Sequence, residues 1–291
     1  GMPSTASQEL AKVKHPIAEG ILQYRHLHDT KTHFATPLSR IEGGRAHPRI
    51  KNTRTETGRL AFADPNLHQI PRRYAEGRVI RDGFVAEEGW SIVSLDYSQV
   101  EMRIAAHITQ CQSMIEMFNE GRDIHTETAA LIFGVDLETA SQDMYRDPTK
   151  SAGFGALYGL TEHGLFSDLA EKGIEGWTLD DCKNFLTDFY RTKPELKVWQ
   201  QQTIGYARRN GYVFDMWGRR RFIPELSHPY KWIQSAGERQ AINMPVQGGA
   251  QGVIKRAMAV LWREYIREHL PWRWLLQIHD SLENEIKDFY I

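Results

Sequence analysis

The stretch IVSLDYSQVEMRIAAHI, residues 92–108, decides the expected fold, because its pattern changes from strand to helix just after one aspartate. The segment IVSLD at 92–96 has the pattern of a buried strand. Three apolar residues then recur at helical spacing, namely Val100, Ile104 and Ile108. Asp96 is therefore expected at the carboxyl end of a strand, just before a helix, which is a favoured place for chemistry.

A second acid, Asp280, is expected in a similar position near the end of the chain. Residues 272–286, WRWLLQIHDSLENEI, predict two short strands joined at His279-Asp280. Neighbouring strands lie ~4.8 Å apart, so Asp96 and Asp280 could share divalent cations. Hard oxygen ligands with few other protein donors suit Mg²⁺ bound together with substrate phosphates. On these two residues alone, ordinary strand ends remain the favoured interpretation.

The stretch RDPTKSAGFGALYG, residues 146–159, predicts a helix that presents a cation and two rings on one face. Pro148 suits the first helical position with Asp147 as the N-cap. The residues on the shared face are Lys150, Phe154 and Tyr158, with Arg146 one turn earlier. Such a face could bind a triphosphate and stack a base, and on spacing alone an amphipathic helix with a core stripe is the better interpretation.

The remaining segments alternate between helical and extended patterns. Helices are predicted over 5–34, through most of 111–210 and over 234–269; strands and loops over 36–84; and a β-hairpin over 211–223. With 291 residues, 41% of them hydrophobic and 11% aromatic, the composition excludes intrinsic disorder. Since no apolar run approaches the ~20 residues of a membrane span, we expect no membrane association, and two well-separated cysteines indicate a reducing, cytoplasmic location.

The net charge of −1 conceals two basic stretches. Residues 40–81 hold ten Lys and Arg against four acids, and residues 191–221 hold eight against two. Two such stretches on an otherwise acidic chain could bind a polyanion, although solvated surface is the more ordinary interpretation on charge alone.

Taken together, these residues resemble one family. In order along the chain, the blocks are TGRLAFADPNLHQIP (57–71), DYSQVEMRIAAH (96–107), GRDIHTETAALIFGV (121–135), RDPTKSAGFGALYG (146–159), WGRRRFIPE (217–225), ERQAINMPVQGGA (238–250) and QIHDS (277–281). All seven match the family A DNA polymerases, the bacterial polymerase I class, in that family's order. The resemblance implies an α/β (α+β) right-hand fold, in which helical fingers are inserted into a palm with an antiparallel sheet. The implied divisions are a thumb remnant (1–35), palm (36–110 and 212–291) and fingers (111–211).

The resemblance also implies a role for each matching residue. Asp96 and Asp280 would be catalytic carboxylates holding two Mg²⁺ ions, with Lys150 near the leaving group. Nucleotide binding is implied for Arg146, Lys150, Phe154, Tyr158, His125, Gln99 and Glu101, the last crowding the sugar 2′ position. Contacts with primer–template DNA are implied for Arg59, Arg239, Asn243, Gln247 and His279. Because polar groups that read shared minor-groove acceptors are indifferent to sequence, these contacts suit a general polymerase.

Three departures from the family pattern affect the expected activity. Ser281 follows Asp280 where the family commonly has Glu, and serine cannot supply that carboxylate. Glu283 is on the same strand face but roughly 6.6 Å along, so we expect it to be a poor substitute. His68-Gln69 replaces the usual Gln-Asn pair. Family members also carry an exonuclease-like domain and a full thumb, so we expect a polymerase fragment without proofreading and with poor processivity.

The expected function is template-directed, primer-dependent DNA synthesis from deoxynucleoside triphosphates by a monomeric enzyme. One alternative is a weakened or inactive fragment that only binds primer–template DNA, as the serine and the missing parts would favour. A related single-subunit RNA polymerase is a third hypothesis, and Glu101 argues against it.

Overall fold

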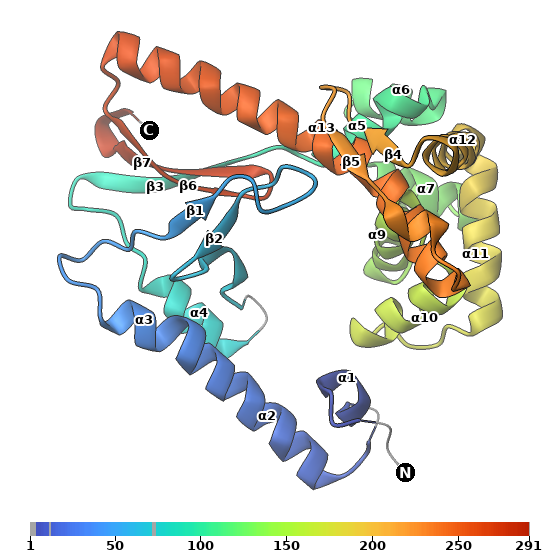
Figure 1. Ribbon diagram of the computed structural model, residues 1–291, viewed down its shortest axis with the longest axis horizontal. Coiled ribbons are helices and arrows are strands. Elements are labelled where there is room, and N and C mark those ends of the chain that lie inside the picture. Colours follow the sequence, from blue (N-terminus) through green and yellow to red (C-terminus); the bar gives the residue numbers. More distant parts are fainter. Residues whose placement is uncertain (1–3, 12, 72–73, 291) are drawn as a thin grey trace. The chain divides into compact units, whose positions relative to one another are not determined.

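The computed structural model describes residues 4–11, 13–71 and 74–290 (Figure 1). The chain divides into two compact units, residues 1–96 with 264–291 and residues 97–263. Each unit is described by itself, and the predicted boundaries at 35, 110 and 211 stay a prediction. Within the described ranges, no helix combines the length and apolar character that crossing a membrane requires.

The first unit is built on a three-stranded antiparallel sheet. Its strands are β3 (Trp90–Asp96), β7 (Ser281–Lys287) and β6 (Trp272–Ile278), in that order across the sheet. Asp96 pairs with Ser281, and Ile278 pairs with the same serine across the β6–β7 turn. The predicted strand pair joined at His279-Asp280 is therefore confirmed. A separate small sheet pairs β1 (Arg49–Lys51) with β2 (Ala61–Ala63).

Strand β3 is less buried than its sequence pattern predicts. Ile92 and Leu95 are 42% and 44% exposed, although IVSLD has the pattern of a buried strand. The cause is that β3 is an edge strand of a three-stranded sheet and pairs only with β7. The prediction of a strand was right, and the prediction of burial was wrong.

Helices complete the first unit. They are α1 (Ser7–Leu10), α2 (Pro16–Thr30), the π-helical segment η1 (Lys31–Ala35), α3 (Thr36–Ser39), η2 (Leu67–Gln69), α4 (Ala75–Asp82) and η4 (Asp288–Tyr290). The helical prediction for 5–34 is confirmed over 7–10 and 16–34 but not over the described residues between them, whereas α3 and α4 lie where only strands and loops were expected. A small core of Phe34, Leu67 and Ile70 contacts Leu276 of β6, so the segment around η2 packs beneath the β6–β7 hairpin.

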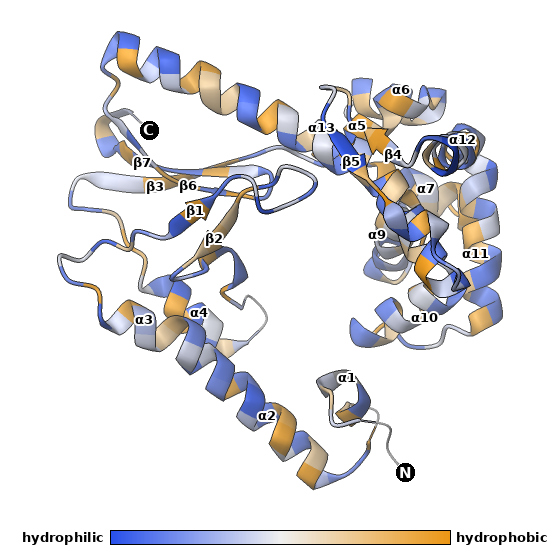
Figure 2. Cartoon of the chain, in the orientation of Figure 1, coloured by the Kyte–Doolittle hydropathy of each residue, from blue (hydrophilic) through white to orange (hydrophobic). Residues whose placement is uncertain are grey.

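The second unit is mainly helical, as predicted for 111–210. Its elements are α5 (Val100–Thr109), α6 (Gln112–Asn119), α7 (Ile124–Phe133), α8 (Leu137–Ala140), α9 (Asp143–Leu157), α10 (Glu162–Glu171), α11 (Leu179–Thr192), α12 (Pro194–Asn210), β4 (Tyr212–Phe214), β5 (Arg220–Phe222), η3 (Pro224–Ser227) and α13 (Lys231–Glu268). The amphipathic helix α11 shows how this core forms, because apolar residues alternate with hydrophilic ones along it (Figure 2). Its buried face presents Cys182, Phe185, Leu186 and Phe189 to the core.

The predicted start of the helix carrying Lys150 was wrong. Helix α9 begins at Asp143 with Gln142 as its N-cap, so Pro148 lies inside the helix and Asp147 is not a cap. Because proline lacks a backbone N–H, Pro148 removes one hydrogen bond near the beginning of α9, and the helix continues past it. The consequence is an additional helical turn before Arg146.

The hairpin β4–β5 packs against α13 through a tryptophan. Trp217 Nε1 donates a hydrogen bond of 2.9 Å to the Gly249 carbonyl, and the Arg256 guanidinium lies 4.3 Å from the ring centroid. A Cβ placed on Gly252 would lie 1.9 Å from Trp217 Nε1, so only glycine permits this approach. Asp215, 1% exposed, accepts the backbone N–H groups of Trp217 and Arg219 and holds the turn.

We therefore expect Gly252→Ala to destabilise the chain by about 2 kcal/mol, because the indole must leave its place on α13. Gly205→Ala is the matched control, since a Cβ there meets only the end of Arg209, at 3.4 Å. We expect the free energy of unfolding of this control to rise by up to about 1 kcal/mol, because alanine has a higher helix propensity than glycine. Urea unfolding measures both, and equal stability of the two variants would contradict the packing described.

Candidate active site

The first unit brings the two predicted metal carboxylates to one end of its sheet. Asp96 ends β3, and its register partner Ser281 directly follows Asp280. Asp280 lies in the two-residue turn between β6 and β7, beside His279, whose φ is 56°. The antiparallel register thus places the two acids next to each other, although 184 residues separate them in the sequence.

The donor chemistry at this end of the sheet fits a divalent cation. Carboxylate oxygens are the hard ligands that such cations prefer, and Asp96 is exposed. Within the described part of the chain, no three His, Cys, Asp or Glu side chains are grouped so that they could hold a metal ion together. A cation here would share its coordination between the two aspartates and oxygens of other molecules, as Mg²⁺ sites with phosphate ligands commonly do.

The second unit places three predicted nucleotide residues around one pocket of about 620 Å³. Lys150, Phe154 and Tyr158 line it from α9, which confirms their expected common face. Arg239 of α13 lines the same pocket. The wall across from them includes Lys172, whose ammonium lies 2.7 Å from both Ser151 Oγ and Asp168 Oδ2. The pocket combines cations with aromatic rings, which suits a phosphorylated molecule that also carries a base.

Arg146, the other predicted phosphate ligand, is held by an acid that the sequence analysis did not single out. Its Nε donates to Asp123 Oδ2 at 2.8 Å. Asp123 also caps α7 by accepting from Thr126. Burial alone would raise the pKa of Asp123, but the hydrogen bonds from Thr126 and Arg146 lower this pKa to about 2. The capping pattern in DIHT, residues 123–126, was the available signal for this residue.

Two further contacts connect the predicted nucleotide residues to one another. The Tyr158 hydroxyl donates a hydrogen bond to Glu101 Oε2, which joins α9 to α5. The His125 ring lies 5.6 Å from that of Phe154, centroid to centroid. Burial lowers the pKa of His125 to about 4, so its imidazole is neutral at physiological pH.

Several of the residues predicted to bind nucleotide or DNA have a buried polar atom without a hydrogen-bond partner among the described residues. Gln99 Oε1, His125 Nε2 and Asn243 Oδ1 are buried and have no hydrogen-bond partner among the described residues. A buried polar group without a partner costs about 1–3 kcal/mol. All three belong to the second unit, where they provide acceptors or donors that a bound molecule could satisfy.

The predicted DNA contacts divide between the two units. Arg239, Asn243 and Gln247 follow one another at four-residue intervals on α13 and therefore share one face of it. Arg59 and His279 belong to the first unit. Near His279, the unusual His68 donates a hydrogen bond from Nε2 to the Gln277 carbonyl at 2.7 Å, and its ring lies 5.4 Å from that of His279. His68 thus stabilises the β6–β7 hairpin, whose turn contains Asp280.

Many basic side chains of the two charged stretches have structural partners. Those paired with acids are Arg45, Arg49, Arg191, Arg208 and Arg219. Arg72 and Arg73 lie outside the described residues. These ion pairs give several of the arginines a partner within the fold, and a role of the remainder in binding DNA stays a prediction.

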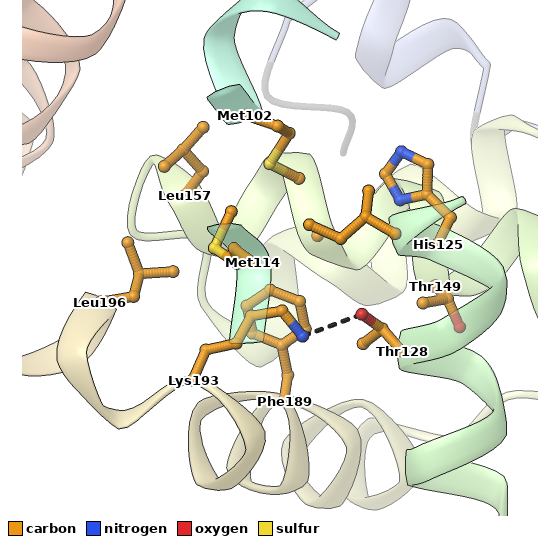
Figure 3. A pocket seen from close by; sticks show the side chains of 11 residues that line it. Met102, Met114, His125, Thr128, Thr149, Leu157, Phe189, Lys193 and Leu196 are labelled. Atoms are coloured by element: carbon orange, nitrogen blue, oxygen red, sulfur yellow. Dashed lines mark hydrogen bonds between the residues drawn. The ribbon is translucent and has the colours of Figure 1, made fainter. Parts of the chain in front are cut away.

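One lysine of the second stretch is buried beside the nucleotide residues. Lys193 is 1% exposed and lines a cavity of about 10 Å³ together with His125 (Figure 3). Its ammonium donates to Thr128 Oγ1 at 2.8 Å and lies 4.7 Å from the Phe189 ring centroid. No acid forms an ion pair with it among the described residues, and burial lowers its pKa to about 8.

We predict that Lys193 makes stability depend on pH. Its ordinary pKa of 10.5 applies in the unfolded chain, so between pH 8 and 10.5 the unfolded state binds more protons and stability rises with pH. Lys193→Met should raise the free energy of unfolding at pH 7 by up to about 3 kcal/mol and remove this rise.

Urea unfolding at pH 7 and pH 10 measures the effect, with exposed Lys183→Met of α11 as the matched control. An unchanged pH dependence in Lys193→Met would contradict the burial of a charged ammonium.

Comparison with known proteins agrees with this arrangement. The model of DNA polymerase family A matches residues 1–290. The thermostable DNA polymerase I of Thermus aquaticus is 42% identical over 282 residues, 96% of this chain and 33% of that polymerase. DNA polymerase I of Bacillus subtilis is 36% identical over 285 residues, 96% of this chain and 32% of its own length.

A solved structure is also similar. It is the POL domain of Pol1 from M. smegmatis in complex with DNA primer-template and dNTP, with a TM-score of 0.85 and 32% identity over 98% of this chain and 50% of that one. The chain spans about a third of the length of the relatives named above. The match of the family model over residues 1–290 leads to one conclusion: the chain belongs to DNA polymerase family A.

Proposed function

We propose that the chain catalyses template-directed, primer-dependent DNA synthesis from deoxynucleoside triphosphates. The observation that carries the proposal is the pairing of β3 with β7, which sets Asp96 beside Asp280 in a member of DNA polymerase family A. The domain division also belongs to the proposal: a thumb remnant over 1–35, fingers over 111–211, and palm over 36–110 and 212–291.

The nucleotide would bind to the face of α9. Arg146 and Lys150 present positive charge to the triphosphate, and their separation of one helical turn lets both reach neighbouring phosphates. Phe154 would lie beside the sugar, and Tyr158 beside the templating base. Glu101, which accepts a hydrogen bond from the Tyr158 hydroxyl, would crowd the sugar 2′ position and so favour deoxynucleotides.

Asp96 and Asp280 would hold two Mg²⁺ ions. When bound, these ions lower the pKa of the primer 3′-hydroxyl and neutralise the charge that develops on the departing pyrophosphate. The 3′-oxygen would attack the α-phosphorus in line and displace pyrophosphate, and Lys150 would stabilise that leaving group. Arg59, Arg239, Asn243, Gln247 and His279 would hold the primer–template in register.

A second candidate function is binding of primer–template DNA without efficient synthesis. Ser281 favours it, because this residue cannot supply the carboxylate that the family commonly has after the second aspartate. The two candidates differ in catalysis and share DNA affinity, so one experiment separates them.

We expect the chain to extend a recessed primer with Mg²⁺ and four deoxynucleotides, and Asp96→Ala to reduce extension by at least a thousandfold, because the cation loses half of its protein ligands. Asp288→Asn, which changes an exposed acid near the other end of β7, is the control. A gel shift on the same DNA should show equal binding by all three proteins. Binding without extension by the unmodified chain would establish the second candidate, and unchanged extension by Asp96→Ala would refute the first.

A further inference from the structure

Glu283 of β7 is held by two serine hydroxyls. Ser281 Oγ lies 2.7 Å from Glu283 Oε1, and Ser94 Oγ of β3 lies 2.9 Å from the same oxygen. Ser94 Oγ donates to Oε1, and the single hydroxyl proton of Ser281 is shared between Oε1 and the Ile278 carbonyl, which lies 3.0 Å from Ser281 Oγ. Oε2 has no hydrogen-bond partner among the described residues. One oxygen of the carboxylate is therefore fixed in place while the other remains available.

The register puts this carboxylate on the same face of the sheet as Asp96. Asp96 pairs with Ser281, and Ser94 pairs with Glu283. Residues two apart in a strand share a face, so all four side chains lie together. The bond to Ser281 shows that Glu283 leans along the strand toward the Asp96–Ser281 pair. The roughly 6.6 Å between positions 281 and 283 is thus largely closed by the length of the glutamate side chain.

The charge of Glu283 is not neutralised by the protein. The next acid on the same strand face, Glu285, bonds to Arg45 at 2.9 Å and to Arg273 at 3.3 Å. Glu283 has no basic side chain within 4 Å in the described part of the chain, and its two partners are uncharged. A carboxylate oriented by neutral donors keeps its full attraction for a cation, whereas one paired with arginine does not.

We propose that Glu283 supplies the carboxylate that Ser281 cannot, and that Ser281 and Ser94 position it toward the divalent-cation site at Asp96 and Asp280. Glu283 acts as a positioning residue: it does not complete a three-ligand cluster, and it strengthens cation binding through its charge and through the hydration shell of the ion. This proposal rests on the proposed function, because that function places the cations at the two aspartates.

A carboxylate at position 283 in place of one at position 281 gives both Ser281 and Ser94 a role. Ser281 carries no carboxylate of its own, and its hydroxyl contacts Glu283 Oε1 at 2.7 Å. Ser94 donates from the opposite strand, so the carboxylate is held from two sides. Hydrogen-bonding partners around a metal site commonly change metal affinity by about 10–100-fold, which sets the size of the expected effect.

The test measures Mn²⁺ binding by isothermal titration calorimetry to the full chain with primer–template DNA whose primer ends in a dideoxynucleotide, plus the complementary deoxynucleotide. No reaction occurs in this complex, so affinity is measured apart from turnover. We expect Glu283→Gln to weaken Mn²⁺ binding about tenfold, and Ser94→Ala to weaken it by a smaller factor. Asp288→Asn is the matched control, because it also removes a carboxylate that accepts a serine hydroxyl, from Ser91 at 2.7 Å.

The double variant S281E/E283Q provides the rescue. If position 283 replaces position 281, moving the carboxylate back to 281 should restore Mn²⁺ affinity to within about threefold of the unmodified chain. Equal affinity of Glu283→Gln and Asp288→Asn would overturn the proposal, and so would failure of the rescue in a variant that folds and binds DNA.

Asp96→Asn separates this proposal from the proposed function. Loss of Mn²⁺ binding in Asp96→Asn with unchanged binding in Glu283→Gln would refute the role of Glu283 alone. Unchanged binding in both variants would refute the cation site itself, and the role of Glu283 with it.

Discussion

The antiparallel pairing of β3 with β7 is the constraint on which the candidate active site depends. Side chains in a strand alternate between faces, so a slip of one residue would move Asp96 away from Ser281 and Glu283. The pairing runs without interruption from Trp90 to Asp96, whereas the neighbouring pair β6–β7 has an irregularity between Trp274 and Leu276. The sheet is therefore most regular along β3 and β7, the strand pair that contains Asp96 and Glu283.

A cluster of charges holds this register at the other end of the sheet. Glu285 is 2% exposed and is bonded by Arg45 and Arg273, which also bond Glu87. Burial alone would raise the pKa of Glu285, but the hydrogen bond from Arg45 and the other basic contacts lower it. The Arg273 guanidinium also lies 4.0 Å from the Trp90 ring centroid, so β3, β6 and β7 are tied together there. One end of the sheet thus has paired charges that fix the fold, and the opposite end has acids with which a cation can interact.

Local patterns in the sequence predicted most of the elements, whereas the roles of the candidate site residues come from the family resemblance and stay a prediction. The strand ending at Asp96, the hairpin around Asp280 and the common face of Lys150, Phe154 and Tyr158 all follow from periodicities of two or of about 3.6 residues. Contacts between distant segments were not accessible in this way. The partner of Arg146, Asp123, is 23 residues away, and the contact of the Ser94 hydroxyl with Glu283 depends on a register that joins positions 189 residues apart.

The wrong predictions have identifiable causes. The start of α9 was placed at Pro148 because proline favours the first turn, but a helix tolerates proline near its beginning when only one hydrogen bond is lost. The burial of β3 was overestimated because an apolar run is typical of central strands, and this one is at an edge.

The most direct test of the central claim is a crystal structure of the chain with Mn²⁺, a dideoxy-terminated primer–template and the complementary deoxynucleotide, with cations located by their anomalous scattering. Two anomalous peaks bound to Asp96 and Asp280, and to the triphosphate beside Arg146 and Lys150, are the predicted result. Bound DNA and nucleotide with no cation at the two aspartates would contradict the account.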